Sequence, residues 1–223
     1  ALIGLAIVAP RASAETINLT LTNSGTAVTY NPYGGKSTTV NGGPFYWNQS
    51  TPLNTNYATE VTTYCIDLDQ SISKGGTYTF TTQTDLKLAP TIGTDAKASA
   101  ITELFDRYYN SSLTSATNAA AFQLALWELV YDGATSKSLT SGRIEGTNSV
   151  AKSMLNSLGT AYSTHDLAGY HLVALVSSSK QDQIMVVPDD CTPPPSGVPA
   201  PPGLVLAGMG FGGLMLGRLR RKA

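Results

Sequence analysis

The hydrophobic period of the chain changes near Thr94 and Asp95, and this change constrains the fold more than any other feature. Upstream, Ile17, Leu19 and Leu21 alternate with polar residues, as in a half-buried β-strand. Downstream, apolar residues recur at helical spacing, and Thr94 or Asp95 can serve as the first N-cap. The final stretch before Pro188 returns to strand-like patterning. Strands, a helical insertion and then strands predict an α+β fold in one domain.

The same patterns set the expected elements. Strands are expected at residues 45–47, 61–68 and 77–82, with turns at Gly34-Gly35, Gly42-Gly43 and residues 73–76. Helices are expected from about residue 94, at residues 116–131 and at residues 148–158, followed by a hairpin of residues 170–177 and 181–187. The prediction is therefore a set of antiparallel strands, a helical region inserted between Cys65 and Gln123, and a returning β-hairpin.

The two ends of the chain predict processing segments. Residues 1–14 are apolar and finish on Ala12-Ser13-Ala14, which is typical of a secretory signal cleaved before Glu15. We expect the charged leading part of that signal to be missing. Residues 15–188 then form the expected domain, and residues 189–202 form a stiff, proline-rich linker.

Residues 203–223 combine an apolar, glycine-rich run with a basic end. The basic residues are Arg218, Arg220, Arg221 and Lys222. The run is short for a full span, but the basic end would stay in the cytoplasm. We therefore expect an exported protein that is held transiently in the inner membrane by this segment.

Charge excludes one class of partner. The chain carries 14 basic and 15 acidic residues, and removing Arg11 and the basic tail leaves a body near −6. No basic stripe remains to neutralise phosphates, so nucleic acid is not an expected partner. No cofactor and no metal site are expected, because acidic pairs such as Asp67 and Asp69 lack the several spaced oxygen ligands of a calcium site.

Cys65 and Gln123 are the residues with the most distinctive chemistry. Gln123 lies on an apolar helical face, where a buried amide without a partner costs about 1–3 kcal/mol. A hydrogen-bonded glutamine is the simplest interpretation. If the Cys65 thiol meets the carboxamide, however, the two can lose ammonia and form an internal thioester. Fixed proximity can supply roughly 7–11 kcal/mol of that barrier, provided that donors hold the amide oxygen.

The residues around this pair resemble a known family. Tyr64-Cys65-Ile66 together with the run Phe122-Gln123-Leu124-Ala125-Leu126-Trp127 resembles the motifs of the thioester domains of bacterial surface adhesins. The run from Gly42 to Trp47 resembles their first strands, and the similarity covers residues 27–187. Phe122 stands where many members carry Thr.

The resemblance implies a Cys65–Gln123 thioester that couples covalently to an amine-bearing target, either protein lysine or an amino-polymer. Tyr64, Phe122, Ala125 and Trp127 would be the supporting packing. Such a protein is an adhesin of the cell surface or extracellular matrix. It makes its bond once, so we expect no enzyme.

The tail resembles a second family signal. Pro199-Ala200-Pro201, followed by the apolar run and the basic end, is similar to the PEP-CTERM sorting segment of exosortase-bearing Gram-negative bacteria. Ala200 replaces the glutamate of that motif. The resemblance implies exosortase as a processing partner.

Two alternatives stay open on the sequence. A Cys65–Cys191 disulfide, or a free Cys65, would leave a passive secreted or surface structural protein. A cysteine hydrolase would need His165 or His171 as its base. Asp67 and Asp69 would raise the pKa of the neighbouring thiol, which disfavours a hydrolase.

Overall fold

A computed structural model describes residues 14–135, 137–159, 167 and 169–189 of the chain. The expected signal segment lies outside these residues except for Ala14, as does the linker except for Asp189. The sorting motif, the basic tail, Cys191 and His165 also lie outside them. Among the described residues, no helix is both long enough and apolar enough to cross a membrane.

The strands form one antiparallel sheet that closes on itself. Its order is β2-β3-β7-β6-β4-β1-β5, and β2 pairs again with β1. The long strand β1 makes this closure, because its first residues pair with β4 while most of its length pairs with β2. The strands are β1 (Thr16–Pro32), β2 (Thr38–Gln49), β3 (Glu60–Cys65), β4 (Thr77–Gln83), β5 (Ile144–Glu145), β6 (Tyr170–Val176) and β7 (Gln183–Pro188).

The period-two pattern predicted β1 correctly. Ile17, Leu19 and Leu21 are fully buried, while their polar neighbours are more exposed. On β2, Trp47 packs edge-on against Phe80 of β4, with ring centroids 5.8 Å apart. These side chains fill the space inside the closed sheet.

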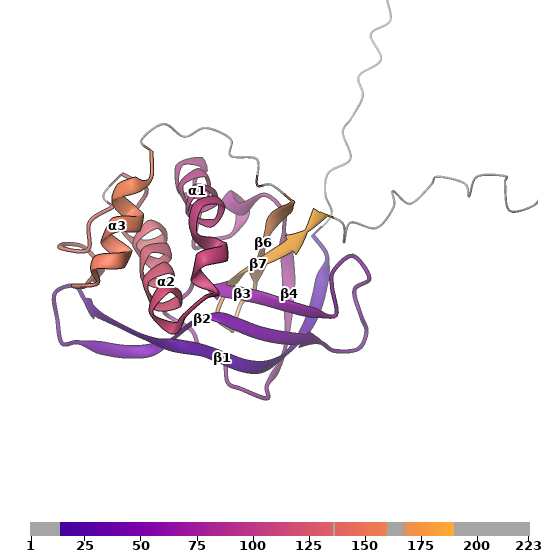
Figure 1. The fold of residues 1–223 in the computed structure, drawn as a ribbon. Helices are drawn as coiled ribbons and strands as arrows, with labels where there is room; N and C mark the ends of the chain where they lie inside the picture. The colour runs from indigo at the N-terminus through magenta and orange to yellow at the C-terminus, as the bar shows by residue number, and fades with distance from the viewer. Residues whose placement is uncertain (1–13, 136, 160–166, 168, 190–223) are drawn as a thin grey trace, which may run out of the picture. The chain divides into compact units, whose positions relative to one another are not determined.

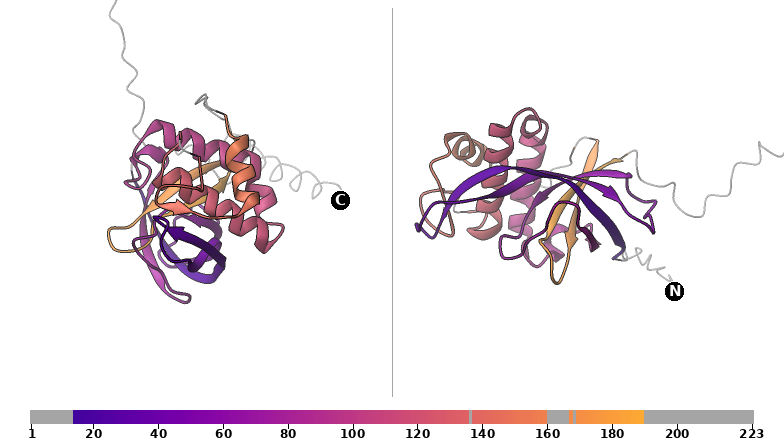
Figure 2. Two further views of the ribbon diagram at one scale, coloured as in Figure 1. Left: turned by 90° about the vertical axis from the view of Figure 1, so that its left-hand side faces the viewer. Right: turned by 90° about the horizontal axis from the view of Figure 1, so that it is seen from below.

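Three helices pack together against the sheet (Figures 1 and 2). They are α1 (Asp95–Ser112), α2 (Ala116–Tyr131) and α3 (Ser149–Ser157), and a short 3₁₀ helix, Leu86–Leu88, precedes them. Each α-helix begins after a polar cap, Thr94, Ser115 or Asn148, whose side chain accepts a hydrogen bond from a backbone N–H three residues on. The central helix α2 contacts α1, α3, β1 and β2. It is apolar on nearly every side because it is enclosed on nearly every side.

This architecture confirms the predicted α+β class, the helical region between Cys65 and Gln123, and the returning β6–β7 hairpin. One expected turn is wrong, because Gly42 and Gly43 lie inside β2. The expected strand at residues 61–68 is shorter, since β3 ends at Cys65. Strand β5 was not predicted.

Candidate functional site

The structure brings Cys65 and Gln123 together although 58 residues separate them. Cys65 is the last residue of β3, Gln123 lies in the middle of α2, and neither has exposed surface. The Cys65 backbone N–H donates to Gln123 Oε1 at 3.1 Å, and Gln123 Nε2 donates to the Cys65 carbonyl at 2.8 Å. The glutamine therefore meets the strand end that carries the thiol.

A second strand also holds the carboxamide. The β2–β3 pairing extends to Phe45 opposite Thr63 and stops there. Just beyond that point, the Gly43 backbone N–H donates to Gln123 Oε1 at 2.7 Å. The amide oxygen thus accepts two backbone N–H groups, one from each strand. Paired donors of this kind stabilise negative charge on a carbonyl oxygen, as in an oxyanion hole.

Two glycines make room for this arrangement. A Cβ atom on Gly42 would lie 2.7 Å from Gln123 Cγ and 2.4 Å from Val28 Cγ2. A Cβ atom on Gly43 would lie 2.4 Å from the Tyr64 ring. The expected turn at this point is therefore a strand against which other side chains pack closely. Glycine inside a strand-like run was the sequence signal that could have revealed this close approach.

The Cys65 thiol is held in its protonated form. Its Sγ donates to the Asp67 carbonyl at 3.1 Å. Burial, with smaller contributions from the carboxyl groups of Asp67 and Asp182, raises the pKa of the thiol to about 12. A free thiolate is therefore scarce at neutral pH, and attack on the carboxamide requires the thiol proton to leave in the same step.

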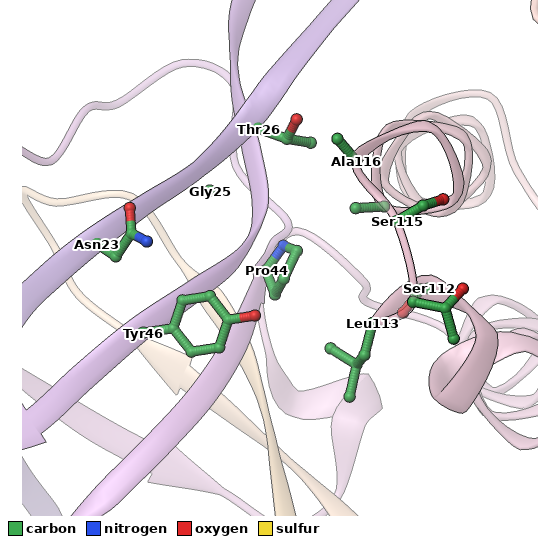
Figure 3. A pocket seen from close by; sticks show the side chains of 11 residues that line it. Asn23, Gly25, Thr26, Pro44, Tyr46, Ser112, Leu113, Ser115 and Ala116 are labelled. Carbon is green, nitrogen blue, oxygen red and sulfur yellow. The ribbon is translucent and has the colours of Figure 1, made fainter.

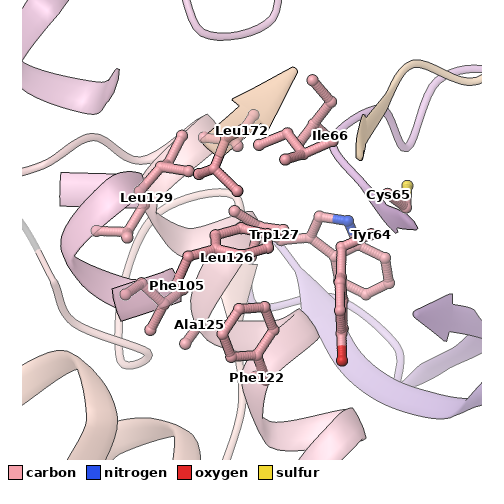
Figure 4. Close-up of a cluster of buried hydrophobic side chains, with 14 of the residues drawn as sticks. Tyr64, Cys65, Ile66, Phe105, Phe122, Ala125, Leu126, Trp127, Leu129 and Leu172 are labelled. Atoms are coloured by element: carbon pink, nitrogen blue, oxygen red, sulfur yellow. The ribbon is translucent and has the colours of Figure 1, made fainter. Parts of the chain in front are cut away.

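The four residues predicted as supporting packing lie in the same buried core as Cys65. Tyr64, Phe122, Ala125 and Trp127 are fully buried, and they belong with Cys65 to one apolar cluster, part of which Figure 4 shows. The Tyr64 and Phe122 ring centroids are 4.6 Å apart, and the Tyr64 hydroxyl lies 2.5 Å from Ser112 Oγ. This packing excludes water from the site.

The indole N–H of Trp127 influences the ionisation of the Cys65 thiol. Nε1 is buried and makes no standard hydrogen bond to any described residue. It nevertheless lowers the thiol pKa, by less than burial raises it. The Trp127 side chain therefore favours negative charge on the sulfur.

A second group of side chains fixes the segment that follows Cys65. Arg143 forms an ion pair with Asp69 and lies over the Tyr131 ring, 4.0 Å from its centroid. The Tyr131 hydroxyl accepts the Leu68 N–H at 2.5 Å, and Asp132 accepts the backbone N–H of Arg143 at 2.6 Å. These contacts join the residues after β3 to the end of α2 and to β5. No sequence pattern had indicated Arg143.

The hydrolase alternative loses one of its two candidate bases. Cys65 pairs with Gln183, and Gln183 pairs with Leu175. His171 lies four residues from Leu175 along β6, about 13 Å away at roughly 3.3 Å per residue. Its Nδ1 lies 3.2 Å from Asp189 Oδ1 instead, so His171 is a partly exposed structural residue. Within the described ranges Cys65 is a free thiol, and no three His, Cys, Asp or Glu residues form a metal-binding group.

Part of the chain matches a known protein family. Residues 62–158 match the family model of the thioester domain (TED), a span that includes Cys65, Gln123 and all three α-helices. One solved structure, the N-terminal thioester domain of a surface protein from Clostridium perfringens, aligns at a TM-score of 0.43 and 11% identity. That alignment covers 76% of this chain and 97% of the other. No curated protein matches the sequence.

Proposed function

We propose that Cys65 and Gln123 condense to an internal thioester, and that the protein uses this bond to couple covalently to an amine on its target. One observation carries the proposal. The Gln123 oxygen accepts two backbone N–H groups while its nitrogen contacts the residue that bears the thiol. The match of residues 62–158 to the thioester-domain family supports the same chemistry.

Formation of the bond is a single acyl substitution. Sγ of Cys65 attacks Cδ of Gln123, the C–N bond breaks, and the thiol proton moves to the departing nitrogen, which leaves as ammonia. The N–H groups of Gly43 and Cys65 stabilise the negative charge that develops on Oε1. Because burial keeps the thiol protonated, proton transfer accompanies the attack.

In coupling to a target, sulfur is the leaving group and no longer the nucleophile. A primary amine attacks the thioester carbon, the C–S bond breaks, and a stable amide is left on Gln123. The amine proton returns to Sγ, so Cys65 ends as a free thiol. The protein changes its own covalent structure once and does not turn over, so we propose a bond-forming adhesin and not an enzyme.

The cellular part of the proposal comes from the chain ends. We propose export through the signal segment at residues 1–14 and exosortase processing at Pro199-Ala200-Pro201. Residues 203–223 would hold the precursor briefly in the inner membrane, and the processed domain would act at the cell surface or in extracellular matrix. Mass measurement of the secreted protein tests this, because unprocessed chains would retain the basic tail.

Intact mass tests the thioester directly. The wild-type protein should lack the mass of one ammonia, and Cys65→Ala and Gln123→Ala should each show their full calculated masses. Methylamine should add to the wild type with release of one thiol. A wild-type protein with full mass and no methylamine adduct would refute the proposal.

A passive structural role is the second candidate, and one observation favours it. Gln123 already has three hydrogen bonds, as an ordinary buried glutamine does. In that case Cys65 is free or joined to Cys191. The same measurement separates the two forms, because a free thiol gives the full mass and a disulfide lowers it by two hydrogens.

A further inference from the structure

A recess of about 280 Å³ opens between the β1–β2 strands and the connection from α1 to α2. Figure 3 shows Thr26, Pro44 and Tyr46 on the strand side, facing Leu113 and Ala116 on the helix side. Tyr46 and Leu113 are 40% and 44% exposed. The recess is therefore open to solvent at a partly apolar mouth.

The inner wall of the recess adjoins the Cys65–Gln123 pair at three points. Pro44 directly follows Gly43, which donates to Gln123 Oε1. Ala119 lines the recess one helical turn before Gln123 on the same face of α2, a separation of about 5–6 Å between Cβ atoms. Ser112, also in the wall, contacts the Tyr64 hydroxyl. The recess therefore ends about one helical turn from Gln123, which is itself fully buried.

The chemistry of the walls suits an amine that is about to react. Among the described residues that line the recess, none is acidic, basic or histidine, so they offer an ammonium ion no carboxylate partner. The N-terminus of α2, whose partial charge is positive, begins at Ala116 on the same wall. Both features favour the uncharged amine, which is the nucleophilic form. Tyr46 and Leu113 offer apolar surface to an alkyl stem.

We propose that this recess is the entry site for the target, and that it accepts a primary amine on an unbranched alkyl stem. The inference rests on the proposed thioester and adds the route by which the amine reaches it. The stem would lie between Tyr46 and Leu113, and the nitrogen would advance past Ala119 to the carbonyl carbon of Gln123.

The test compares plugged and matched variants, with butylamine as the probe. Ala116→Trp and Leu113→Trp place an indole at the mouth, where both native residues are exposed. Thr117→Trp adds the same group to the neighbouring exposed residue, which does not line the recess. The ammonia deficit of each protein is measured first, and the rate of butylamine coupling is then followed by intact mass.

We expect all four proteins to show the deficit. Ala116→Trp and Leu113→Trp should couple butylamine at least tenfold more slowly than wild type, and Thr117→Trp within about twofold of it. If the deficit is present and both plugged variants couple at the wild-type rate, the entry site is wrong while the thioester stands. If the wild type has no deficit, the proposed function fails and the entry site fails with it.

Discussion

Gln123 and Cys65 exchange two hydrogen bonds, one in each direction, as facing residues of an antiparallel pair do. The side chain of a helix residue therefore takes the place of a strand neighbour. This happens where β2 and β3 cease to pair, so the carboxamide joins Gly43 in the interior of β2 to Cys65 at the end of β3. The contact is both a structural join and the geometry from which the proposed chemistry starts.

Gly43→Ala should disturb this join. The new Cβ would lie 2.4 Å from the Tyr64 ring, which cannot move freely because it packs against Phe122. We expect a loss of about 1–3 kcal/mol in the free energy of unfolding and a smaller fraction of ammonia-deficient protein. Urea denaturation and intact mass measure the two effects.

Gly146→Ala is the matched control for that substitution. Its Cβ would meet only Leu124 Cδ2, at 3.4 Å, and its backbone φ is not positive. This variant should keep the wild-type stability to within about 1 kcal/mol. Equal effects of the two substitutions would show that the close approach at Gly43 is unimportant.

Arg143→Ala should admit water to the thioester. The change removes the ion pair with Asp69 and the contact with the Tyr131 ring, which together fix the segment after Cys65. We expect a stability loss of roughly 1 kcal/mol and faster hydrolysis, seen as a gain of one water by the ammonia-deficient form. Lys87→Ala, which removes an exposed ion pair with Asp95, should hydrolyse at the wild-type rate.

Glu128→Gln should stabilise the protein in a pH-dependent way. Burial raises the pKa of Glu128 from 4.5 to about 8, and one of its oxygens, Oε2, has no partner among the described residues. The folded state therefore binds this proton more tightly than the unfolded state. The stability that the proton provides is complete below pH 4.5 and is lost as the pH rises through 8.

The variant has no such titration, so its advantage should grow with pH. We expect unfolding free energies that are similar at pH 4.5 and differ by about 2–4 kcal/mol in favour of Glu128→Gln at pH 8.5. Urea denaturation at both pH values provides the measurement, and Glu60→Gln on the surface provides the comparison. A difference that shrank as the pH rose would contradict the assigned direction of the shift.

Trp127→Phe should slow coupling while leaving the ammonia deficit in place. The substitution removes the N–H that favours negative charge on the departing sulfur. We expect coupling to methylamine to slow by about tenfold, on the order of 1.4 kcal/mol. Trp47→Phe makes the same change at a buried indole whose N–H donates to Thr63 Oγ1, so it should lower stability without slowing coupling.

The sequence predicted the helices and the final hairpin well because their signals are local. Thr94, Ser115 and Asn148 cap helices whose apolar spacing is visible within a few turns. Closure of the sheet was not predictable in this way. It depends on the pairing of β1 with both β2 and β4. The register of such long-range pairs cannot be recognised in a short stretch of sequence.

In the candidate site, too, local features could be predicted from the sequence and long-range contacts could not. Chemistry and family resemblance together pointed to Cys65 and Gln123, while their spacing in the chain gave no information. The sequence did not predict the roles of Gly42, Gly43 and Arg143, because each depends on a neighbour that only the fold supplies. Gly42 lies against Gln123, Gly43 lies against Tyr64, and Arg143 pairs with Asp69. A glycine pair between Asn41 and Pro44 indicates a turn when only the sequence is known.

The join between β3 and α2 also has a mechanical meaning. A bond from Cys65 to Gln123 would close a covalent loop of the chain that contains all of α1. Such a cross-link restricts the conformational freedom of the loop when the domain unfolds. Reaction with an amine breaks this thioester and leaves the target attached to Gln123 of α2. Coupling to the target and loss of this internal cross-link would then occur in one step. The domain coupled to its target would be easier to unfold than the domain with an intact thioester.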